Sequence, residues 1–173
     1  GGGAYLGALY NCALTGNVAD ANGGGVDGGM LVDCRLTGNL SGGNGGGASY
    51  CVLMNHCTFL GNFAVGAGGG VYYGTLTNCT FISNTAGGNG GGAYSDGCTL
   101  NNCTFDGNSA NAYGGGVCYG LADHCTFTGN VATNSGGGTA WVTLTNCTDS
   151  GNYAKYSAGG AYAGSLANCI VNG

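Results

Sequence analysis

The stretch TNCTFISN, from Thr77 to Asn84, decides the fold because close variants of it return along the whole chain. The variants are MNHCTFLGN, NNCTFDGN, DHCTFTGN and TNCTDSGN, each with a cysteine in the same place. Cysteines of this series are 22, 23, 22, 24, 22, 22 and 22 residues apart, and an asparagine follows five residues after each of the first seven. The cysteines are Cys12, Cys34, Cys57, Cys79, Cys103, Cys125, Cys147 and Cys169. The asparagines are Asn17, Asn39, Asn62, Asn84, Asn108, Asn130 and Asn152. Such regularity is typical of a solenoid.

A period near 22 residues suits one coil of a parallel β-helix or one leucine-rich repeat. The second class needs several leucines and usually a helical segment per repeat, whereas helix formers are few here. In CTF the cysteine and the aromatic residue lie two positions apart, which places both side chains on one side of a strand. We therefore predict an all-β fold, a right-handed parallel β-helix of about eight coils of about 22 residues each.

Glycine clusters mark the starts of the predicted coils within one domain that comprises residues 1–173. The starts lie near residues 1, 23, 45, 68, 90, 114, 136 and 158. With strands about 4.8 Å apart, eight coils give a rod roughly 38 Å long. The extra one and two residues before Cys57 and Cys103 should bulge at turns and leave the stack intact.

The recurring cysteine is best interpreted as a small buried hydrophobic residue, because leucine and phenylalanine flank it on the inward side. Zinc is not expected, since a single-file column supplies one sulfur per coil rather than four converging ligands. Disulfides between adjacent coils are possible by distance. Three of the eleven cysteines, Cys51, Cys98 and Cys118, lie outside the column, and Cys98 with Cys118 is a possible disulfide.

The asparagine column predicts a structural corner, because asparagine tolerates the left-handed backbone of a tight turn. Stacked amides also hydrogen-bond from one layer to the next in cross-β assemblies. We expect this ladder to shape the turn that follows each CTF strand.

The composition excludes several classes of partner. Arg35 and Lys155 are the only basic residues against seven acidic ones, and the formal net charge is −5. Nucleic acid and anionic membranes are therefore not expected as partners. No apolar run approaches the roughly 20 residues of a spanning helix. The chain opens with three glycines rather than Met, so we expect a processed product or an excerpt of a longer protein.

Two short motifs carry a resemblance to a known family. F-x-x-N occurs at Phe59–Asn62, Phe81–Asn84, Phe105–Asn108 and Phe127–Asn130. G-G-A occurs at Gly2–Ala4, Gly46–Ala48, Gly91–Ala93 and Gly159–Ala161, and G-G-G-V ends at Val26, Val71 and Val117. The chain resembles bacterial right-handed β-helix repeat surface proteins, in particular the polymorphic outer-membrane protein repeats. The resemblance implies a secreted or surface-exposed protein of adhesive or structural role, without catalytic residues.

An active site is not indicated. Polysaccharide-degrading β-helix enzymes and glycosidases need clustered carboxylates, whereas the aspartates here occupy different offsets in different coils. Arg35, Asp33 and Asp27 could share one surface patch, and His56 and His124 lie three coils apart. The stretch Gly87–Asp96 lacks the nine-residue period of calcium-binding rolls. We expect neither catalysis nor a cofactor, with calcium unlikely. Asp149 stands in the column of Phe and Leu, where a buried carboxylate needs a partner.

Residues expected on the outer faces of the coils suggest candidate sites for glycosylation and for binding. Asn39, Asn78, Asn102 and Asn146 begin N-glycosylation sequons, three of which a repeated NCT would also create by accident. Tyr5, Tyr72, Tyr94 and Tyr162 share one offset and are expected to form an aromatic stripe for contact with sugar or protein. A threonine follows five of the cysteines directly, but the irregular second member of each Thr-x-Thr makes ice binding a minor alternative.

These features favour a non-catalytic structural protein, extracellular or on the cell surface. The first hypothesis is a fibre subunit that stacks head-to-tail on copies of itself, with the sequons as candidate sites for glycans. The alternative is a stalk or passenger segment of a bacterial adhesin. A carbohydrate-active β-helix enzyme is a further minor alternative.

Overall fold

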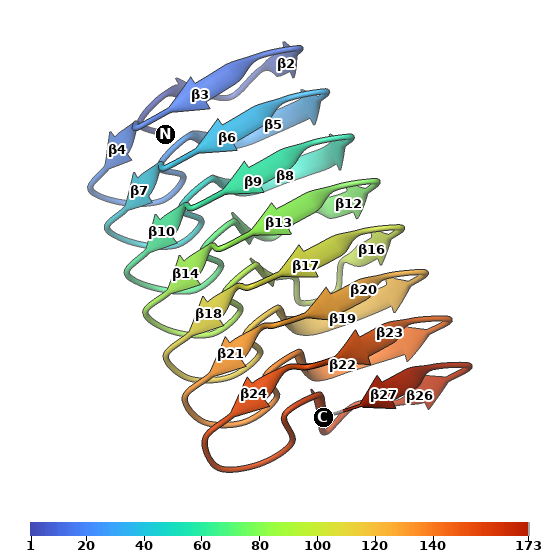
Figure 1. The fold of residues 1–173 in the computed structure, drawn as a ribbon. Coiled ribbons are helices and arrows are strands. Elements are labelled where there is room, and N and C mark those ends of the chain that lie inside the picture. The colour runs from blue at the N-terminus through green and yellow to red at the C-terminus, as the bar shows by residue number, and fades with distance from the viewer. Residues whose placement is uncertain (173) are drawn as a thin grey trace.

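The computed structural model describes residues 1–172 and shows a parallel β-helix, as the repeat predicts. Each of the first seven coils contributes strands to three parallel sheets and the eighth to two of them, and successive coils stack from the N-terminus to the C-terminus at the opposite end of the rod (Figure 1). All of the strand pairs in the described chain are parallel and join each coil to its neighbours. The predicted fold class, with about eight coils, is confirmed.

The strands are short, and the three sheets take them in rotation. Sheet A comprises β1 (Ala4–Tyr5), β2 (Ala8–Tyr10), β5 (Val26–Val32), β8 (Ala48–Asn55), β11 (Val71–Tyr72), β12 (Thr75–Thr77), β15 (Ala93–Tyr94), β16 (Thr99–Asn101), β19 (Val117–Asp123), β22 (Thr139–Thr145), β25 (Ala161–Tyr162) and β26 (Leu166–Ala167). Sheet B comprises β3 (Ala13–Thr15), β6 (Arg35–Thr37), β9 (Thr58–Leu60), β13 (Thr80–Ile82), β17 (Thr104–Asp106), β20 (Thr126–Thr128), β23 (Thr148–Ser150) and β27 (Ile170–Asn172). Sheet C comprises β4 (Val18–Ala19), β7 (Leu40–Ser41), β10 (Phe63–Ala64), β14 (Thr85–Ala86), β18 (Ser109–Ala110), β21 (Val131–Ala132) and β24 (Tyr153–Ala154).

The register between coils is constant, so equivalent residues of the repeat form columns along the rod. Leu76 pairs with Met54 on one side and Leu100 on the other, as the repeat requires. The extra residue before Cys57 is accommodated in β8, where the register shifts and Val52 stands 78% exposed. The two extra residues before Cys103 lie in the turn between β15 and β16. Both insertions leave the columns in step, as predicted, although the first is a bulge in a strand rather than at a turn.

The core is a stack of similar layers, most regular from the third coil to the sixth. Phenylalanine rings of sheet B lie one above another, with centroids 4.7, 4.6 and 5.1 Å apart and planes within about 10° of parallel. They belong to Phe59, Phe81, Phe105 and Phe127, all fully buried. Offset stacking of this kind stabilises an aromatic pair beyond its buried area. These four coils therefore repeat the same aromatic packing.

The repeated Gly-Gly-Gly has a separate reason at each position, as residues 68–70 illustrate. Gly68 has a φ of +67°, which favours glycine. A Cβ on Gly69 would lie 2.3 Å from the carbonyl oxygen of Gly91 in the next coil. A Cβ on Gly70 would lie 2.8 Å from the ring of Phe81. The cluster thus lets the backbone turn, approach its neighbour and receive the aromatic column.

Candidate functional site

The cysteine column lies inside the rod, where its thiols are hydrogen-bonded. Each thiol donates to the carbonyl oxygen of the residue two positions earlier, at 3.1–3.4 Å. From Cys34 to Cys147 the side chains are buried, whereas Cys12 and Cys169 in the outer coils are half-buried. The neighbouring thiol and burial raise the pKa of Cys57 and of Cys147. At Cys57 and Cys147 the thiols are therefore neutral packing groups rather than reactive thiolates.

The possible disulfide between Cys98 and Cys118 is not formed, and this prediction is corrected. Both are free thiols. Cys118 pairs with Tyr94, whereas the carbonyl oxygen of Cys98 accepts from Leu121, three residues further along β19. The two-residue insertion displaces Cys98 along the sheet. Burial also raises the pKa of Cys118 and of Cys51 to about 12.

The asparagine column is a ladder of amides that hydrogen-bond from one coil to the next, buried from Asn39 to Asn152. The amide of Asn84 donates to Asn108 Oδ1 in the next coil at 2.9 Å and to the Phe59 carbonyl oxygen at 3.0 Å. Its backbone N–H also donates to Asn108 Oδ1, at 3.0 Å. The same three bonds recur from Asn39 to Asn130. The left-handed residue of the turn is the one before each asparagine, a glycine in every coil except that of Ser83. The ladder therefore satisfies buried backbone groups.

The four sequons divide into two environments. Asn39 is buried, and its amide donates to the Leu14 carbonyl oxygen and to Asn62 Oδ1, both at 3.0 Å. A glycan at Asn39 is incompatible with this packing, which corrects that candidate. Asn102 and Asn146 are exposed and Asn78 is half-buried, at corners with φ of 52–54°. Asn102 donates to Asn78 Oδ1 at 2.7 Å, so these side chains form a second amide ladder on the surface.

Asp149 occupies the phenylalanine column and is fully buried. The Asn152 amide donates to its Oδ1 at 2.6 Å, and the Thr139 hydroxyl lies 3.4 Å from its Oδ2. Burial raises the pKa of Asp149 to about 6, although both hydrogen bonds act in the opposite direction. The carboxyl group is therefore partnered rather than turned outward.

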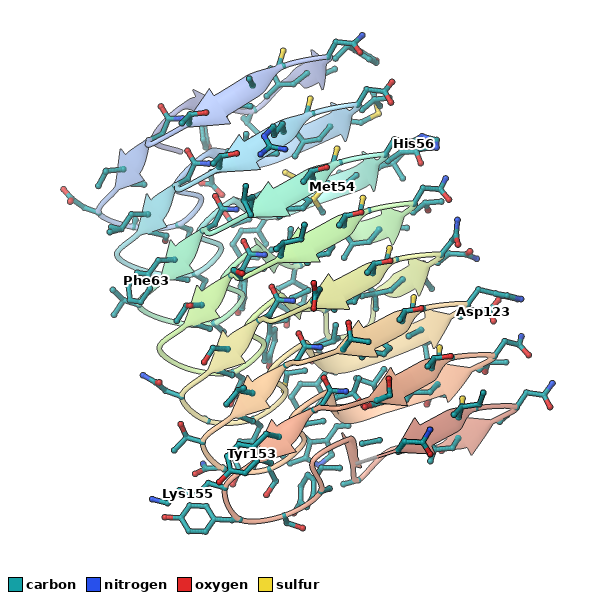
Figure 2. The ribbon with its side chains drawn as sticks, viewed as in Figure 1. Met54, His56, Phe63, Asp123, Tyr153 and Lys155 are labelled. Atoms are coloured by element: carbon teal, nitrogen blue, oxygen red, sulfur yellow. The ribbon has the colours of Figure 1, made fainter. Side chains whose placement is uncertain are left out.

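The other charged residues are scattered over the surface. Within residues 1–172 the ion pairs are those of the N-terminus with Asp27, at 3.9 Å, and of His124 with Asp123, at 2.9 Å. Arg35 consequently forms no ion pair with Asp33 or Asp27. Figure 2 shows His56 and Asp123 on one edge of the rod, several coils apart, with Phe63, Tyr153 and Lys155 on the opposite edge. Over residues 1–172, no three His, Cys, Asp or Glu side chains gather as metal ligands would.

The most extensive surface feature is a line of aromatic rings along sheet A, here called the aromatic ladder. Neighbouring ring centroids lie 4.7–6.2 Å apart from the third coil to the eighth. The members are Tyr50, Tyr72, Tyr73, Tyr94, Tyr113, Tyr119, Trp141 and Tyr162. All are half-buried except Tyr50, which is 52% exposed. The ladder is continuous along most of the rod.

The sequence predicted this surface only in part. Tyr72, Tyr94 and Tyr162 belong to the ladder, whereas Tyr5 is separated from them by coils with Asp27 and Ser49 at the same position. Tyr50, Tyr73, Tyr119 and Trp141 were missed, because they stand one position later in their coils. At that position φ is 51–62°, so the chain bends and brings the two columns together. A search for aromatic residues at either of two adjacent offsets would have found them.

A hollow of about 550 Å³ lies on sheet A. Leu121 and Thr143, two residues after Tyr119 and Trp141 on β19 and β22, line it together with Thr77 and Thr99. Its lining combines threonine hydroxyl groups and apolar surface with the amide of Asn101 and the carboxyl group of Asp123. Burial within the ladder raises the pKa of Tyr94 to about 12, so its phenol stays neutral at physiological pH.

Comparisons of the chain with protein-family models, curated proteins and solved structures gave no match. No helix in the described part of the chain is long and apolar enough to cross a membrane.

Proposed function

We propose that this chain is a non-catalytic structural protein, a β-solenoid rod that stacks head-to-tail on copies of itself in an extracellular fibre. The constant register of the coils carries the proposal. Because each coil presents the same columns in the same order, the C-terminal coil offers a template that an N-terminal coil fits. Leu166 would face Leu9 of another copy, and Val171 would face Leu14, as equivalent residues do within the rod.

The contact between neighbouring coils within the rod illustrates what such a contact between copies would bury. Leu144 pairs with Leu166 of the next coil and is fully buried. A strand edge with unpaired N–H and C=O groups recruits another strand. The contact is heterologous and related by a translation along the rod, so it does not close and gives a filament.

Three observations support an extracellular or cell-surface location for this rod. The coils and their F-x-x-N and G-G-A motifs resemble the repeats of polymorphic outer-membrane proteins, whose role is adhesive or structural. Lys155 and Arg35 are the only sites for trypsin-like proteases. The exposed sequons at Asn102 and Asn146 offer glycan attachment along one edge. The rod would equally serve as the stalk of an adhesin, in which neighbouring sequence covers its ends.

Electron microscopy of the native material separates the fibre from the stalk. Continuous rods with an axial repeat near 38 Å, the rise of eight coils at about 4.8 Å each, support the fibre. Isolated short rods, or stalks that end in other domains, overturn it. The matched variants are Val171→Asp, which places a charge on the stacking face, and Thr80→Asp, which places one on the lateral face of β13. Filaments must disappear with Val171→Asp and persist with Thr80→Asp.

A further inference from the structure

The backbone of the aromatic ladder does not favour the residues that occupy it. Tyr50, Tyr73, Tyr119 and Trp141 have φ of 51°, 60°, 62° and 54°, and the equivalent residue of the second coil is Gly28, with φ of 77°. A left-handed backbone costs a bulky L-residue roughly 1 kcal/mol or more relative to glycine. The turn alone would favour glycine at this column, yet four of its residues are aromatic. We infer that these residues serve the surface that their rings form rather than the turn.

The rings are arranged so that ligand-sized surface remains open. Tyr50 and Tyr73, Tyr72 and Tyr94, and Tyr119 and Trp141 form near-parallel pairs with centroids 5.8, 5.3 and 5.1 Å apart. Carbon atoms in contact are about 3.5–4 Å apart. Because the centroids of these near-parallel rings are further apart than that, the rings are laterally displaced rather than directly superposed. Each ring keeps part of one face uncovered, in agreement with its partial exposure.

The charged residues near the ladder indicate what charge its partner can carry. Single-stranded nucleic acid and acidic polymers need cations beside the stacking rings, and neither Arg35 nor Lys155 is part of the ladder. Asp96 lies close to the ladder and helps to raise the pKa of Tyr72 and Tyr73, after burial as the main cause, and Asp123 lines the hollow. These carboxylates disfavour an anionic partner, whereas a neutral partner is not repelled.

We propose that the aromatic ladder and the hollow on sheet A bind a neutral polysaccharide, an extended chain of β-linked hexopyranoses that lies parallel to the rod axis. A hexopyranose has an apolar C–H face, which packs on an aromatic ring, and a rim of hydroxyl groups, which suits Thr77, Thr99 and Thr143 of the hollow. Successive sugar rings of an extended β-1,4-linked chain repeat at nearly the distance between successive rings of the ladder. Binding requires only one rod and holds for a fibre or a stalk.

The test uses Trp141, the single tryptophan of the chain, as a reporter within the ladder. The 173-residue chain is titrated with cellohexaose, mannohexaose and hexagalacturonate, and binding is followed by tryptophan fluorescence and calorimetry. We expect one of the neutral hexasaccharides to bind and hexagalacturonate not to bind.

The variants replace tyrosines at the strained column by a residue that tolerates its backbone. Tyr73→Asn and Tyr119→Asn keep a left-handed conformation accessible, so folding is retained while a ring is removed, and each should weaken binding about tenfold. Tyr153→Asn, on sheet C, is the matched control and should leave the affinity unchanged. Retained thermal stability of the variants shows that a loss of affinity is not unfolding.

Three outcomes overturn the proposal. They are absence of binding by both neutral hexasaccharides at millimolar concentration, equal affinity of the ladder variants and wild type, and preferential binding of hexagalacturonate. Lateral association of rods, detected by sedimentation and abolished by Tyr119→Asn without any effect of saccharide, would assign the ladder to a second copy of the chain instead. None of these results depends on whether the rods stack end to end.

Discussion

The fifth and seventh coils have equivalent strands in sheet B, but different residues fill the interior there. In the fifth coil Phe105 stacks between Phe81 and Phe127, and the position that faces it from sheet A is Ala93. In the seventh coil Asp149 replaces the phenylalanine, and the position of Ala93 is taken by Thr139, whose hydroxyl lies beside the carboxyl group. The two residues that depart from the repeat in this coil, Asp149 and Thr139, therefore contact each other, and the buried acid has a hydrogen-bond partner.

The side-chain amides of the asparagine ladder also have different acceptors in these two coils. Asn108 in the fifth coil donates to the Phe81 carbonyl oxygen and to Asn130 Oδ1. Asn152 in the seventh coil donates to the Phe127 carbonyl oxygen and to Asp149 Oδ1. The comparison teaches that the phenylalanine column accommodates the carboxyl group of Asp149 where two donors of the same coil turn to it.

The largest effect is expected from moving the acid into the coil that lacks its partners. Phe105→Asp removes a buried ring, which costs about 3–5 kcal/mol, and buries a carboxyl group opposite Ala93, which has no donor. We expect a total loss above about 5 kcal/mol in the free energy of unfolding, measured by urea denaturation. Phe105→Leu, the control that keeps the site apolar, should cost less than about 1.5 kcal/mol. A comparable loss for both variants would contradict the role of the missing donors.

The second effect is the pH dependence that Asp149 in the seventh coil contributes. The folded-state pKa of Asp149 is about 6 against 3.8 for the ordinary group, so the folded state holds the proton more tightly. The stabilisation is complete below pH 4 and is lost as the pH rises to about 6, by about 3 kcal/mol in total. Urea denaturation between pH 4 and pH 8 measures this slope. Asp149→Asn should flatten it, and an unchanged slope in that variant would show that another group titrates.

A smaller loss is expected when the hydroxyl partner alone is removed. Thr139→Val restores the Val seen at the equivalent positions 71 and 117 but takes a donor from the ionised carboxylate. At pH 8 we expect destabilisation of about 1 kcal/mol, and at pH 4 little change. Thr143→Val, an exposed position of the same strand, provides the control. Equal effects at both pH values would mean that Thr139 acts by packing and not through Asp149.

The sequence predicted which residues recur in each column and hence the fold. It predicted less reliably how side chains point at the corners between neighbouring columns. The cysteine and phenylalanine periods specified a parallel β-helix, because a side-chain period of two and a coil period of 22 leave little other geometry. The asparagine column was placed at the corner, whereas the left-handed residue is the glycine before it and the amide turns inward. The residue one position away from a corner points in a direction that spacing alone does not determine.

The candidate sites depend on contacts that cross such corners, and the sequence predicted them incompletely. Asp149 was recognised as an exception, but Thr139 was not connected to it, since ten residues and a sheet boundary separate them. Likewise Tyr72 was found by its offset, while Tyr73 next to it was not included in the same stripe. Cys98 and Cys118 looked adjacent by coil number, but the inserted residues shift one of them along the sheet.

The smallest expected effect is a gain, at the one coil where the turn before the asparagine ladder departs from glycine. Ser83 has φ of 53°, and its equivalents Gly61 and Gly107 have φ of 60° and 61°. Ser83→Gly relieves the left-handed strain at the cost of a more flexible unfolded chain, for a net stabilisation of about 0.5–1 kcal/mol in urea denaturation. The matched control is Ser150→Gly in β23, where the backbone is extended and the same exchange should destabilise by about the same amount. Since the two exchanges are chemically identical, opposite signs would show that the left-handed turn, and not the loss of a hydroxyl, sets the preference for glycine at that column.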